Sequence, residues 1–383
     1  MRPFGDTISL DEARGLIGRA LKPIERIEPV ALEAAHGRVL AQDVVATADV
    51  PPFSRAAMDG YAVRAADTAG ATPASPVVLA WIEKVFTGQM PSRTVGGGEC
   101  IEIATGAPMP DGADSVVMVE ETAADGPRIQ IFNAANSGQN IGRQGADIKT
   151  GQTVMRRGDL LNASRVGAIA ALGLAHVDVY AQPRVAILST GNEIVEPGRP
   201  LQPGQIYDIN RFTVAAVVAE HGGVPIPHRT DVLVFSGGTS VGERDLILDA
   251  LGSRGEVLFH GISVKPGKPT AFGLVNGRPF FGMPGYPSSC LLNTHILLVP
   301  ALRLIARLPP AARRTVTLPL ARRVLSAKDR HQFYTVRVAD GVAIPAYKAS
   351  GDITSMSQAD GYFEIDAATD AVAEGTLVEV TLF

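Results

Sequence analysis

The sequence predicts a chain of several domains that combines an α/β domain with β-rich domains. Two apolar runs, Val185–Leu188 and Val232–Phe235, are typical of buried parallel strands, and each is followed by a glycine-containing loop. Short β-type runs separated by Gly and Pro occupy about residues 44–119 and return after Pro310. We therefore expect an α/β core, an inserted β lobe and a separate C-terminal β domain.

Composition excludes several classes of function. The 383 residues carry a net charge of −4, which argues against a general surface for polyanions. Aromatic residues make up only 5% of the chain, so platforms for stacking nucleic-acid bases are not expected. Cys100 and Cys290 stand far apart and form no CxxC motif, which argues against a disulfide framework and a thiolate zinc site. We expect no nucleic-acid partner.

The sequence also argues against a membrane protein. The first residues lack the charged segment and apolar core of a signal peptide. The most apolar tract, Cys290–Leu308, is interrupted by polar residues and by Pro300, as in the core helix of a globular domain. We expect a cytoplasmic protein with no membrane partner.

Three helices have recognisable starts or ends. Ser9-Leu10-Asp11-Glu12 is a capping box before an apolar stripe. A second helix is predicted over Ala163–Leu174. Asn210 can cap a third helix that runs to about Glu220 and stops at Gly222-Gly223.

The crossover after this third helix is too short. Val224–Pro227 reads as its following strand, and the next strand already begins at Val232. A parallel crossover normally takes a dozen or more residues and includes a helix. Since loss of that helix would uncover an apolar sheet face, we favour residues missing from the chain over a true deletion. This interpretation predicts a Cα–Cα step between Pro227 and Val232 much longer than the usual value of about 3.8 Å.

The loop "SGGTSVGERD", Ser236–Asp245, combines a phosphate-type glycine spacing with acids. Gly237 and Gly242 have P-loop spacing, but Glu243-Arg244 replace the Lys and Ser/Thr of a P-loop. A second loop, "STGNEIVEPG", follows the other parallel strand at Ser189. Loops at the carboxyl ends of neighbouring parallel strands face one crevice, where ligands bind in open α/β sheets.

Two more stretches of the α/β region add cationic and backbone groups. "VKPGKPTAFG" holds Lys265 and Lys268 in a stiff Pro-Gly turn, although a solvated basic turn is the ordinary alternative. "GMPGYPSS" opens a helix whose N–H groups can face an anion. Lysines suit phosphate, and carboxylates tolerate phosphate when a cation such as Mg²⁺ bridges them. The residues alone predict a phosphorylated small molecule bound with a divalent metal.

Seven stretches occur in a familiar order, and the resemblance that they carry extends over nearly the whole chain. They are "PPFSRAAMDGYAV", "ATGAPMPDGADSVVMVE", "STGNEIVEPG", "GQIYDIN", "SGGTSVGERD", "KPGKPTAFG" and "GMPGYPSS". In this order the chain resembles the molybdopterin molybdenumtransferases, a family that includes bacterial molybdenum-insertion enzymes and the E domain of gephyrin.

The resemblance implies a reaction and a fold. The reaction takes adenylylated molybdopterin and molybdate as substrates, uses Mg²⁺, and releases AMP and molybdenum cofactor. The implied fold is an elongated chain with a Rossmann-like α/β domain that binds molybdopterin, a discontinuous linking domain, an inserted β-rich lobe and a C-terminal β-barrel. The α/β domain is expected over 7–26 and 178–308, and the linking domain over 27–45 and 143–177. The β-rich lobe is expected over 46–142 and the C-terminal β-barrel over 309–383. A homodimer is implied, with each active site between the α/β domain of one subunit and the β lobe of the other.

The resemblance also assigns site residues. It implies catalytic roles for Asp59, Thr105, Glu193 and Asp245, with Asp59 and Asp245 also holding the metal. It implies that substrate is bound by Asp147, Ser236, Gly237, Gly238, Ser240, Gly242, Lys265, Lys268, Pro284 and Pro287.

Two alternatives remain open at the level of the sequence. One is a molybdopterin adenylyltransferase-like enzyme, which needs only the α/β domain. The other is a non-enzymatic scaffold of the gephyrin type. The resemblance makes the adenylyltransferase and acceptor molybdoenzymes candidate partners. It does not separate molybdate from tungstate, since both are tetrahedral dianions of similar size.

Overall fold

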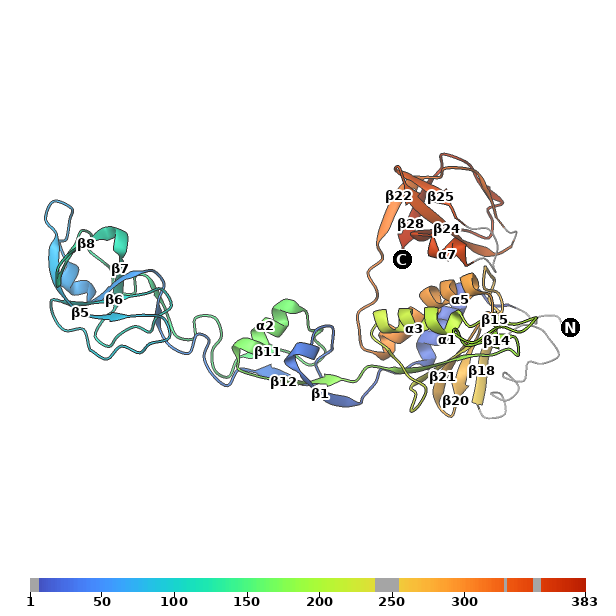
Figure 1. The fold of residues 1–383 in the computed structure, drawn as a ribbon, viewed down its shortest axis with the longest axis horizontal. Helices are drawn as coiled ribbons and strands as arrows, with labels where there is room; N and C mark the ends of the chain where they lie inside the picture. Colours follow the sequence, from blue (N-terminus) through green and yellow to red (C-terminus); the bar gives the residue numbers. More distant parts are fainter. Residues whose placement is uncertain (1–6, 238–254, 327–328, 347–352) are drawn as a thin grey trace. The chain divides into compact units, whose positions relative to one another are not determined.

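The structure is a computed structural model of the 383-residue chain, and it describes residues 7–237, 255–326, 329–346 and 353–383. The chain divides into two compact units. Unit 1 comprises 1–28, 37–39 and 179–383, and unit 2 comprises 29–36 and 40–178. Both units are rich in β-sheet, and helices concentrate in unit 1 (Figure 1).

Unit 2 is built on a six-stranded sheet with the order β7-β4-β6-β5-β9-β8. Its strands are β4 (Gly60–Val63), β5 (Val77–Val85), β6 (Glu99–Ile103), β7 (Ser115–Met118), β8 (Thr122–Asp125) and β9 (Arg128–Ile131). Side chains alternate between two buried clusters, so that Ile101 and Ile103 face one cluster and Cys100 faces the other. Gly60 allows close strand contact, because a Cβ there would lie 1.9 Å from the Val117 carbonyl oxygen.

Short paired strands and one helix complete unit 2. They are β1 (Ile27–Ala31), β2 (Val44–Val45), β3 (Arg55–Ala56), β10 (Ile141–Gly142), β11 (Thr153–Met155), α2 (Ala163–Ala171) and β12 (His176–Tyr180), with 3-10 turns η1 (Leu32–Ala34), η2 (Ala65–Thr68) and η3 (Val119–Glu121). The predicted second helix is α2, and the Asn162 side chain caps it by accepting a hydrogen bond from the Arg165 N–H.

Unit 1 contains the predicted α/β core, a six-stranded sheet with the order β16-β13-β17-β21-β20-β18. Its strands are β13 (Arg184–Ser189), β16 (Val224–Pro225), β17 (Val232–Ser236), β18 (Gly255–His260), β20 (Ala271–Val275) and β21 (Arg278–Met283). The first four strands in this order run parallel to one another. Strand β20 pairs antiparallel with β21, and β18 pairs antiparallel with β20. The parallel part confirms the prediction made from the runs at Val185 and Val232.

Helices cover one face of this sheet (Figure 1). They are α1 (Leu10–Ala20), α3 (Asn210–Glu220), and a continuous helical stretch of α5 (Pro287–Asn293), the π turn η4 (Thr294–Leu298) and α6 (Val299–Ile305). The capping box is present, because Ser9 Oγ accepts from the Glu12 N–H at 3.1 Å. The expectation that Asn210 caps α3 is wrong: Ile209 is the N-cap residue, and the Asn210 side chain bonds to other loops instead.

On the opposite sheet face the described residues are unevenly buried, with Ala271 and Phe280 fully buried. Val232 and Val234 point into the helix-covered core and are fully buried, whereas Leu233 and Phe235 on the other face are partly buried. Leu188, also on strand β13, is 45% exposed. Apolar surface of this kind is normally packed under a helix in a parallel sheet.

The predicted chain break is absent, and this expectation is corrected. The chain is continuous from β16 to β17 through residues 226–231, which cross from one side of β13 to the other. The Ile226 N–H donates to the Val185 carbonyl and the Asp231 N–H to the Arg184 carbonyl, so the short connection is tied to β13. The connection is therefore helix-free, and the partial exposure of the second sheet face accompanies it.

A second sheet in unit 1 carries the C-terminal residues, with the order β19-β24-β26-β28-β22 and β25 paired to β24. Its strands are β19 (Val264–Lys265), β22 (Thr315–Pro319), β24 (His331–Ala339), β25 (Val342–Pro345), β26 (Gly361–Ile365) and β28 (Leu377–Leu382), accompanied by β23 (Val324–Leu325), β27 (Ala371–Val372) and α7 (Thr354–Ser357). Strand β19 comes from the α/β region and pairs in parallel with β24. The segment around Lys265 is thereby joined to the C-terminal sheet.

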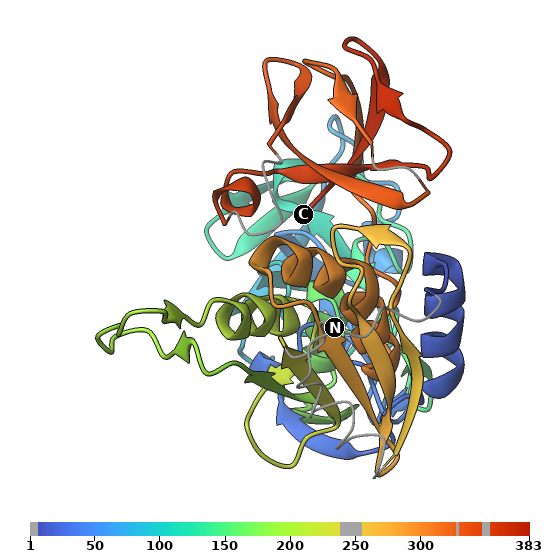
Figure 2. The ribbon, with the colours of Figure 1, turned by 90° about the vertical axis from the view of Figure 1, so that its right-hand side faces the viewer.

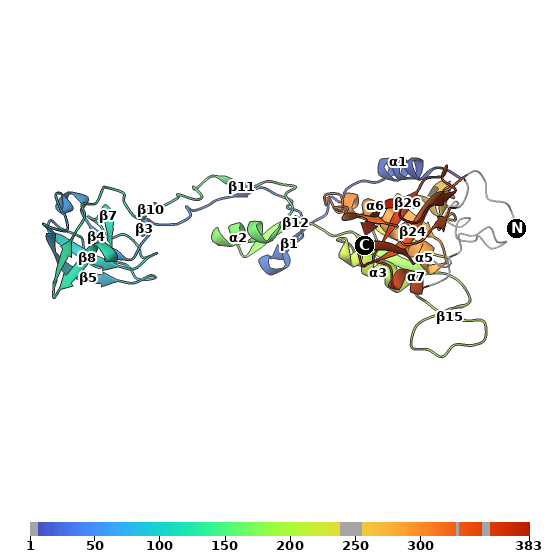
Figure 3. The ribbon, with the colours of Figure 1, turned by 90° about the horizontal axis from the view of Figure 1, so that it is seen from above.

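The apolar tract near Cys290 forms a core helix, as predicted. Pro287–Ile305 has a most apolar window with mean hydropathy 1.4, and 72% of this window is buried inside the fold. By contrast, the arm that carries β14 (Ile194–Val195) and β15 (Ile206–Tyr207) stands away from the sheet (Figures 2 and 3).

Candidate functional site

Three loops meet at the carboxyl ends of β13, β17 and β21. The Thr190 N–H donates to the Ser236 carbonyl at 2.9 Å, and the Gly237 N–H donates to the Met283 carbonyl at 3.1 Å. Gly237 has a φ of +86°, and a Cβ there would lie 2.7 Å from the Thr190 carbonyl oxygen. A side chain at this position would push the first two loops apart. The first residues of the loops after β13 and β17 therefore lie at one edge of the sheet, as the sequence predicts, and the rest of the loop after β17 lies outside the described residues.

A buried amide ties this junction together. Asn210 Nδ2 donates to Ser236 Oγ at 2.6 Å and to the Gly285 carbonyl at 2.8 Å. Asn210 is 7% exposed, and its Oδ1 has no partner among the described residues. The first residue of α3 thus holds the last residue of β17 to the loop after β21.

Asp208 supports the remaining loop. Its Oδ1 accepts from Ser189 Oγ at 2.8 Å and from the Arg211 N–H at 3.1 Å. Sequence reasoning misses Asp208 and Asn210 as site residues, although both lie in the motif "GQIYDIN". The signal in the sequence was that two polar residues stand at a predicted helix start. Polar residues at this position are also typical of an ordinary helix cap, so the signal did not indicate a site.

Glu193 lies on the arm that leaves the first loop. Its carboxylate folds over Gly191, where a Cβ would lie 2.5 Å from Glu193 Oε2. Its backbone carbonyl accepts from the Ile206 N–H, which joins the two sides of the arm. The residue itself is exposed, so its carboxylate is available to a ligand or to solvent.

The two candidate lysines lie on a turn with a buried base. Pro266 and Gly267 are buried, whereas Lys265 and Lys268 are partly exposed. The Ile262 N–H donates to the Lys268 carbonyl at 3.0 Å, and Lys265 pairs with Gln332 of β24. The backbone of the turn is therefore held on both sides, while the two lysines keep contact with solvent, so the choice between a ligand site and a solvated basic turn stays a prediction for binding measurements.

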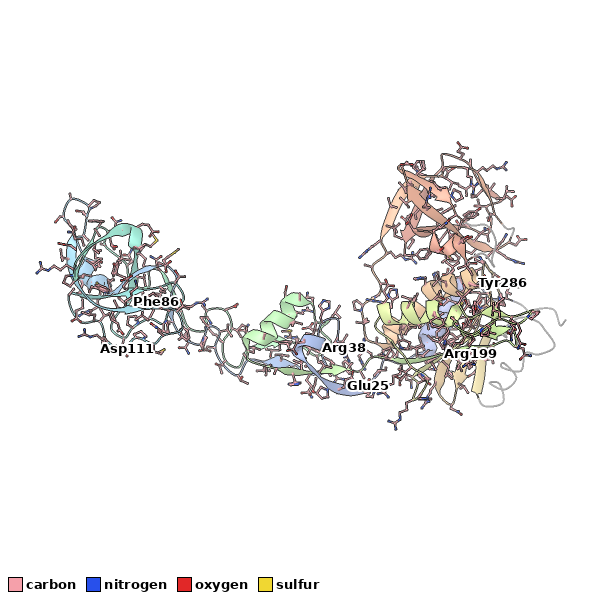
Figure 4. All side chains as sticks on the ribbon, in the orientation of Figure 1. Glu25, Arg38, Phe86, Asp111, Arg199 and Tyr286 are labelled. Atoms are coloured by element: carbon pink, nitrogen blue, oxygen red, sulfur yellow. The ribbon has the colours of Figure 1, made fainter. Side chains whose placement is uncertain are left out.

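The last predicted loop joins β21 to α5. Pro284 is buried, and Pro287 is the first residue of α5, where its missing N–H costs no helical hydrogen bond. Gly285 lies close to Gly237, with 3.6 Å between a Gly285 Cβ and Gly237 Cα. Tyr286, labelled in Figure 4, is 65% exposed beside this junction.

Cys290 lies beneath the junction but is not a nucleophile. Its Sγ is 3.9 Å from Ser236 Oγ, and the residue is fully buried. Burial raises the pKa of this thiol to about 12, so the reactive thiolate is not populated near neutral pH.

In unit 2 the structure brings two predicted residues together. Asp59 Oδ1 accepts from the Thr105 N–H at 2.8 Å, and both residues are exposed. Asp147 is exposed as well, and its N–H donates to the Val50 carbonyl. The hydrogen bond joins the Met-Asp-Gly stretch to the Thr-Gly-Ala-Pro stretch, which are far apart in the sequence.

Four predicted site residues, Gly238, Ser240, Gly242 and Asp245, lie outside the described residues. Within the described ranges, no group of three or more His, Cys, Asp or Glu side chains is arranged to hold a metal ion. The predicted metal pair of Asp59 and Asp245 therefore remains a prediction.

Comparison with known proteins identifies the family. Residues 8–173 match the MoeA N-terminal region (domain I and II), residues 226–304 match a probable molybdopterin binding domain, and residues 317–383 match the MoeA C-terminal region (domain IV).

Named relatives match over almost their full length. Molybdopterin molybdenumtransferase 2 of Mycobacterium tuberculosis is 35% identical, with 94% of this chain and 95% of the relative covered. The molybdopterin molybdenumtransferase of Haemophilus influenzae is 31% identical, with 98% of each chain covered. A crystal structure of a molybdopterin biosynthesis MoeA protein from Pyrococcus horikosii has a TM-score of 0.85 at 38% identity and covers 98% of this chain and 99% of its own.

The three matched regions span both units and include the ends of β17 and β21, while the two relatives and the solved structure cover 94–98% of the chain. They agree with the motif order in the sequence and with the arrangement of the fold. The chain belongs to the molybdopterin molybdenumtransferase family of molybdenum cofactor biosynthesis.

Proposed function

We propose that this protein inserts molybdenum from molybdate into adenylylated molybdopterin, releasing AMP and molybdenum cofactor. The observation that carries the proposal is the junction of the loops after β13, β17 and β21 beside a braced turn with two lysines. This edge of an open parallel sheet is where such folds bind ligands. Family membership supplies the reaction class.

The described residues support separate roles for the two sides of the site. Lys265 and Lys268 are partly exposed on a fixed turn, so they can offset the charge of phosphate and molybdate. Ser236, Gly237, Pro284 and Pro287 shape the wall that receives the pterin. Glu193 is an exposed carboxylate next to this wall and is suited to orient a polar group.

The geometry of Asp59 suits a magnesium ligand. One of its oxygens is bonded to the Thr105 N–H, which leaves the other oxygen of an exposed carboxylate for a cation. Mg²⁺ is commonly held by one or two carboxylates together with substrate phosphates. We propose Asp59 and Asp245 as these carboxylates. In this proposal the Thr105 N–H orients Asp59, and Asp147 lies near the substrate. When bound, the ion would neutralise negative charge that develops on the phosphate.

We further propose a cytoplasmic homodimer in which Asp59 and Thr105 of one subunit serve the lysine-bearing site of the other. The adenylyltransferase and acceptor molybdoenzymes are the proposed partners in transfer of the cofactor. An adenylyltransferase-like role is disfavoured, because a stand-alone adenylyltransferase does not need the matched N-terminal and C-terminal regions.

The experiment is an assay of AMP release from adenylylated molybdopterin with and without molybdate. The protein should release AMP only when molybdate is present. Lys268→Ala should raise the KM for the adenylylated pterin, most strongly at low salt, whereas the exposed Lys22→Ala should not. AMP release at the same rate with and without molybdate would contradict the proposal. Equal effects of the two lysine substitutions on the KM would contradict it as well.

A further inference from the structure

A second buried amide, Asn293, lies beneath the lysine turn. Asn293 is the last residue of α5 and has 0% exposure. Its Nδ2 donates to the Gly267 carbonyl at 2.9 Å and to Thr270 Oγ1 at 2.5 Å. Thr270 Oγ1 donates to the same Gly267 carbonyl at 2.8 Å. The three groups form a polar cluster that fastens the middle of the turn to the core helix.

The turn lies directly on the amide. Gly267 has a φ of +112°, a conformation that L side chains rarely adopt. A Cβ at Gly267 would lie 2.4 Å from Asn293 Nδ2 and 2.7 Å from its Cγ. Only a glycine therefore permits this contact, and the shape of the turn depends on what stands at position 293.

Packing alone does not account for an asparagine here. Asn293 Oδ1 is buried and has no partner among the described residues, which is unfavourable for a polar atom. A leucine of similar size would avoid this unpaired acceptor. The two donated bonds to the turn are the contribution that an apolar residue could not make.

The lysines depend on this support. The flanks of the turn are held by the pairing of Lys265 with Gln332 and by the Ile262 N–H bond to the Lys268 carbonyl. Neither contact reaches Gly267, which lies between the lysines. The cluster on Asn293 therefore sets the angle between the two halves of the turn.

We propose that Asn293 is a positioning residue that directs Lys265 and Lys268 toward the anionic substrate. The inference rests on the proposed function of those lysines. The helix changes to a π turn at Thr294–Leu298 immediately after Asn293, and such turns are frequent at functional sites. The same helix begins at Pro287, so one rigid element supports both the pterin wall and the lysine turn.

Four variants test this role in the AMP-release assay. Asn293→Leu and Thr270→Val should each raise the KM for adenylylated molybdopterin about tenfold while changing kcat little, because hydrogen bonds that orient a charged site are lost. Thr270→Ser keeps the hydroxyl and should stay near wild type. Thr294→Val is the matched control, since Thr294 is also fully buried on this helix, and its hydroxyl donates to the Cys290 carbonyl within the helix.

A double-mutant comparison separates positioning from general damage. In a Lys265→Ala/Lys268→Ala background, Asn293→Leu should raise KM no further. A further tenfold rise there, or an equal effect of Thr294→Val, would overturn the inference.

If the lysine variants raise KM but Asn293→Leu and Thr270→Val do not, positioning fails and the proposed function stands. If the lysine variants themselves have no effect, the proposed role of the turn fails too. If Asn293→Leu does not fold, the KM of Thr270→Val decides whether the polar cluster positions the lysines.

Discussion

Replacing Asn210 by alanine removes the amide that links two loops of the site. The Asn210 bond to Ser236 Oγ is 2.6 Å long, and Ser236 is 3% exposed, so its hydroxyl loses a partner in a dry environment. The bond to the Gly285 carbonyl is 2.8 Å long, but Gly285 is exposed and water can replace the donor. The first loss costs about 1–3 kcal/mol and the second about 0.5–1.5 kcal/mol.

One term acts in the opposite direction. Asn210 Oδ1 is itself buried without a partner among the described residues, and the alanine removes this atom. Relief of that penalty offsets about 1 kcal/mol, which leaves a net destabilisation of about 2 kcal/mol. Because the end of β17 and the loop after β21 are no longer joined, the KM for adenylylated molybdopterin should rise as well.

The assay combines urea unfolding with AMP-release kinetics. Asn162→Ala is the matched control, because Asn162 also stands at a helix start but caps α2 in unit 2. Its loss should cost about 1 kcal/mol without changing KM. If Asn210→Ala changes stability by less than about 0.5 kcal/mol and leaves KM at the wild-type value, the reasoning about this amide is refuted.

Two further predictions concern stability. Burial, followed by the neighbouring His221, lowers the pKa of His295 from 6.5 to about 4, so this ring stays neutral in the folded protein while it protonates in the unfolded chain. Stability should therefore fall as pH drops from 6.5 toward 4, by at most about 3 kcal/mol, and His295→Phe should reduce this loss in urea unfolding at pH 7 and pH 4.5. A variant with an unchanged acid loss would contradict the assignment. Asp231→Asn breaks the pair with Arg26, whose two bonds measure 3.1 and 3.0 Å, and should cost about 1–3 kcal/mol. Glu196 provides the control, because its ion pairs with Arg199 and Arg211 are both exposed, and Glu196→Gln should change the unfolding midpoint very little.

Local patterns in the sequence determine the elements of this fold. The capping box places the start of α1, and the apolar runs at Val185 and Val232 become β13 and β17. The run Ser115–Met118 coincides with β7. These predictions succeed because capping, periodicity and burial act between neighbouring residues, and neighbours are visible in a linear text. The convergence of the first two α/β loops also follows from strand direction alone.

The family resemblance supplied the proposed function, and the matched domains and relatives confirm the family. Site roles for Gly238, Ser240, Gly242 and Asp245 rest on that resemblance, since these residues lie outside the described ranges. The remaining site assignments are proposals that the kinetic variants can test.

Only the tertiary structure decided how polar side chains are used. Asn210 reads as a helix cap in the sequence, yet its amide joins Ser236 to Gly285, which are distant along the chain. Asn293 reads as one polar residue in an apolar helix, yet it holds Gly267. The short connection 226–231 likewise looked like missing chain, and the fold passes through it without a helix. A side chain's partner depends on which segments meet in space, and burial, which makes each such hydrogen bond matter, is a property of the folded chain.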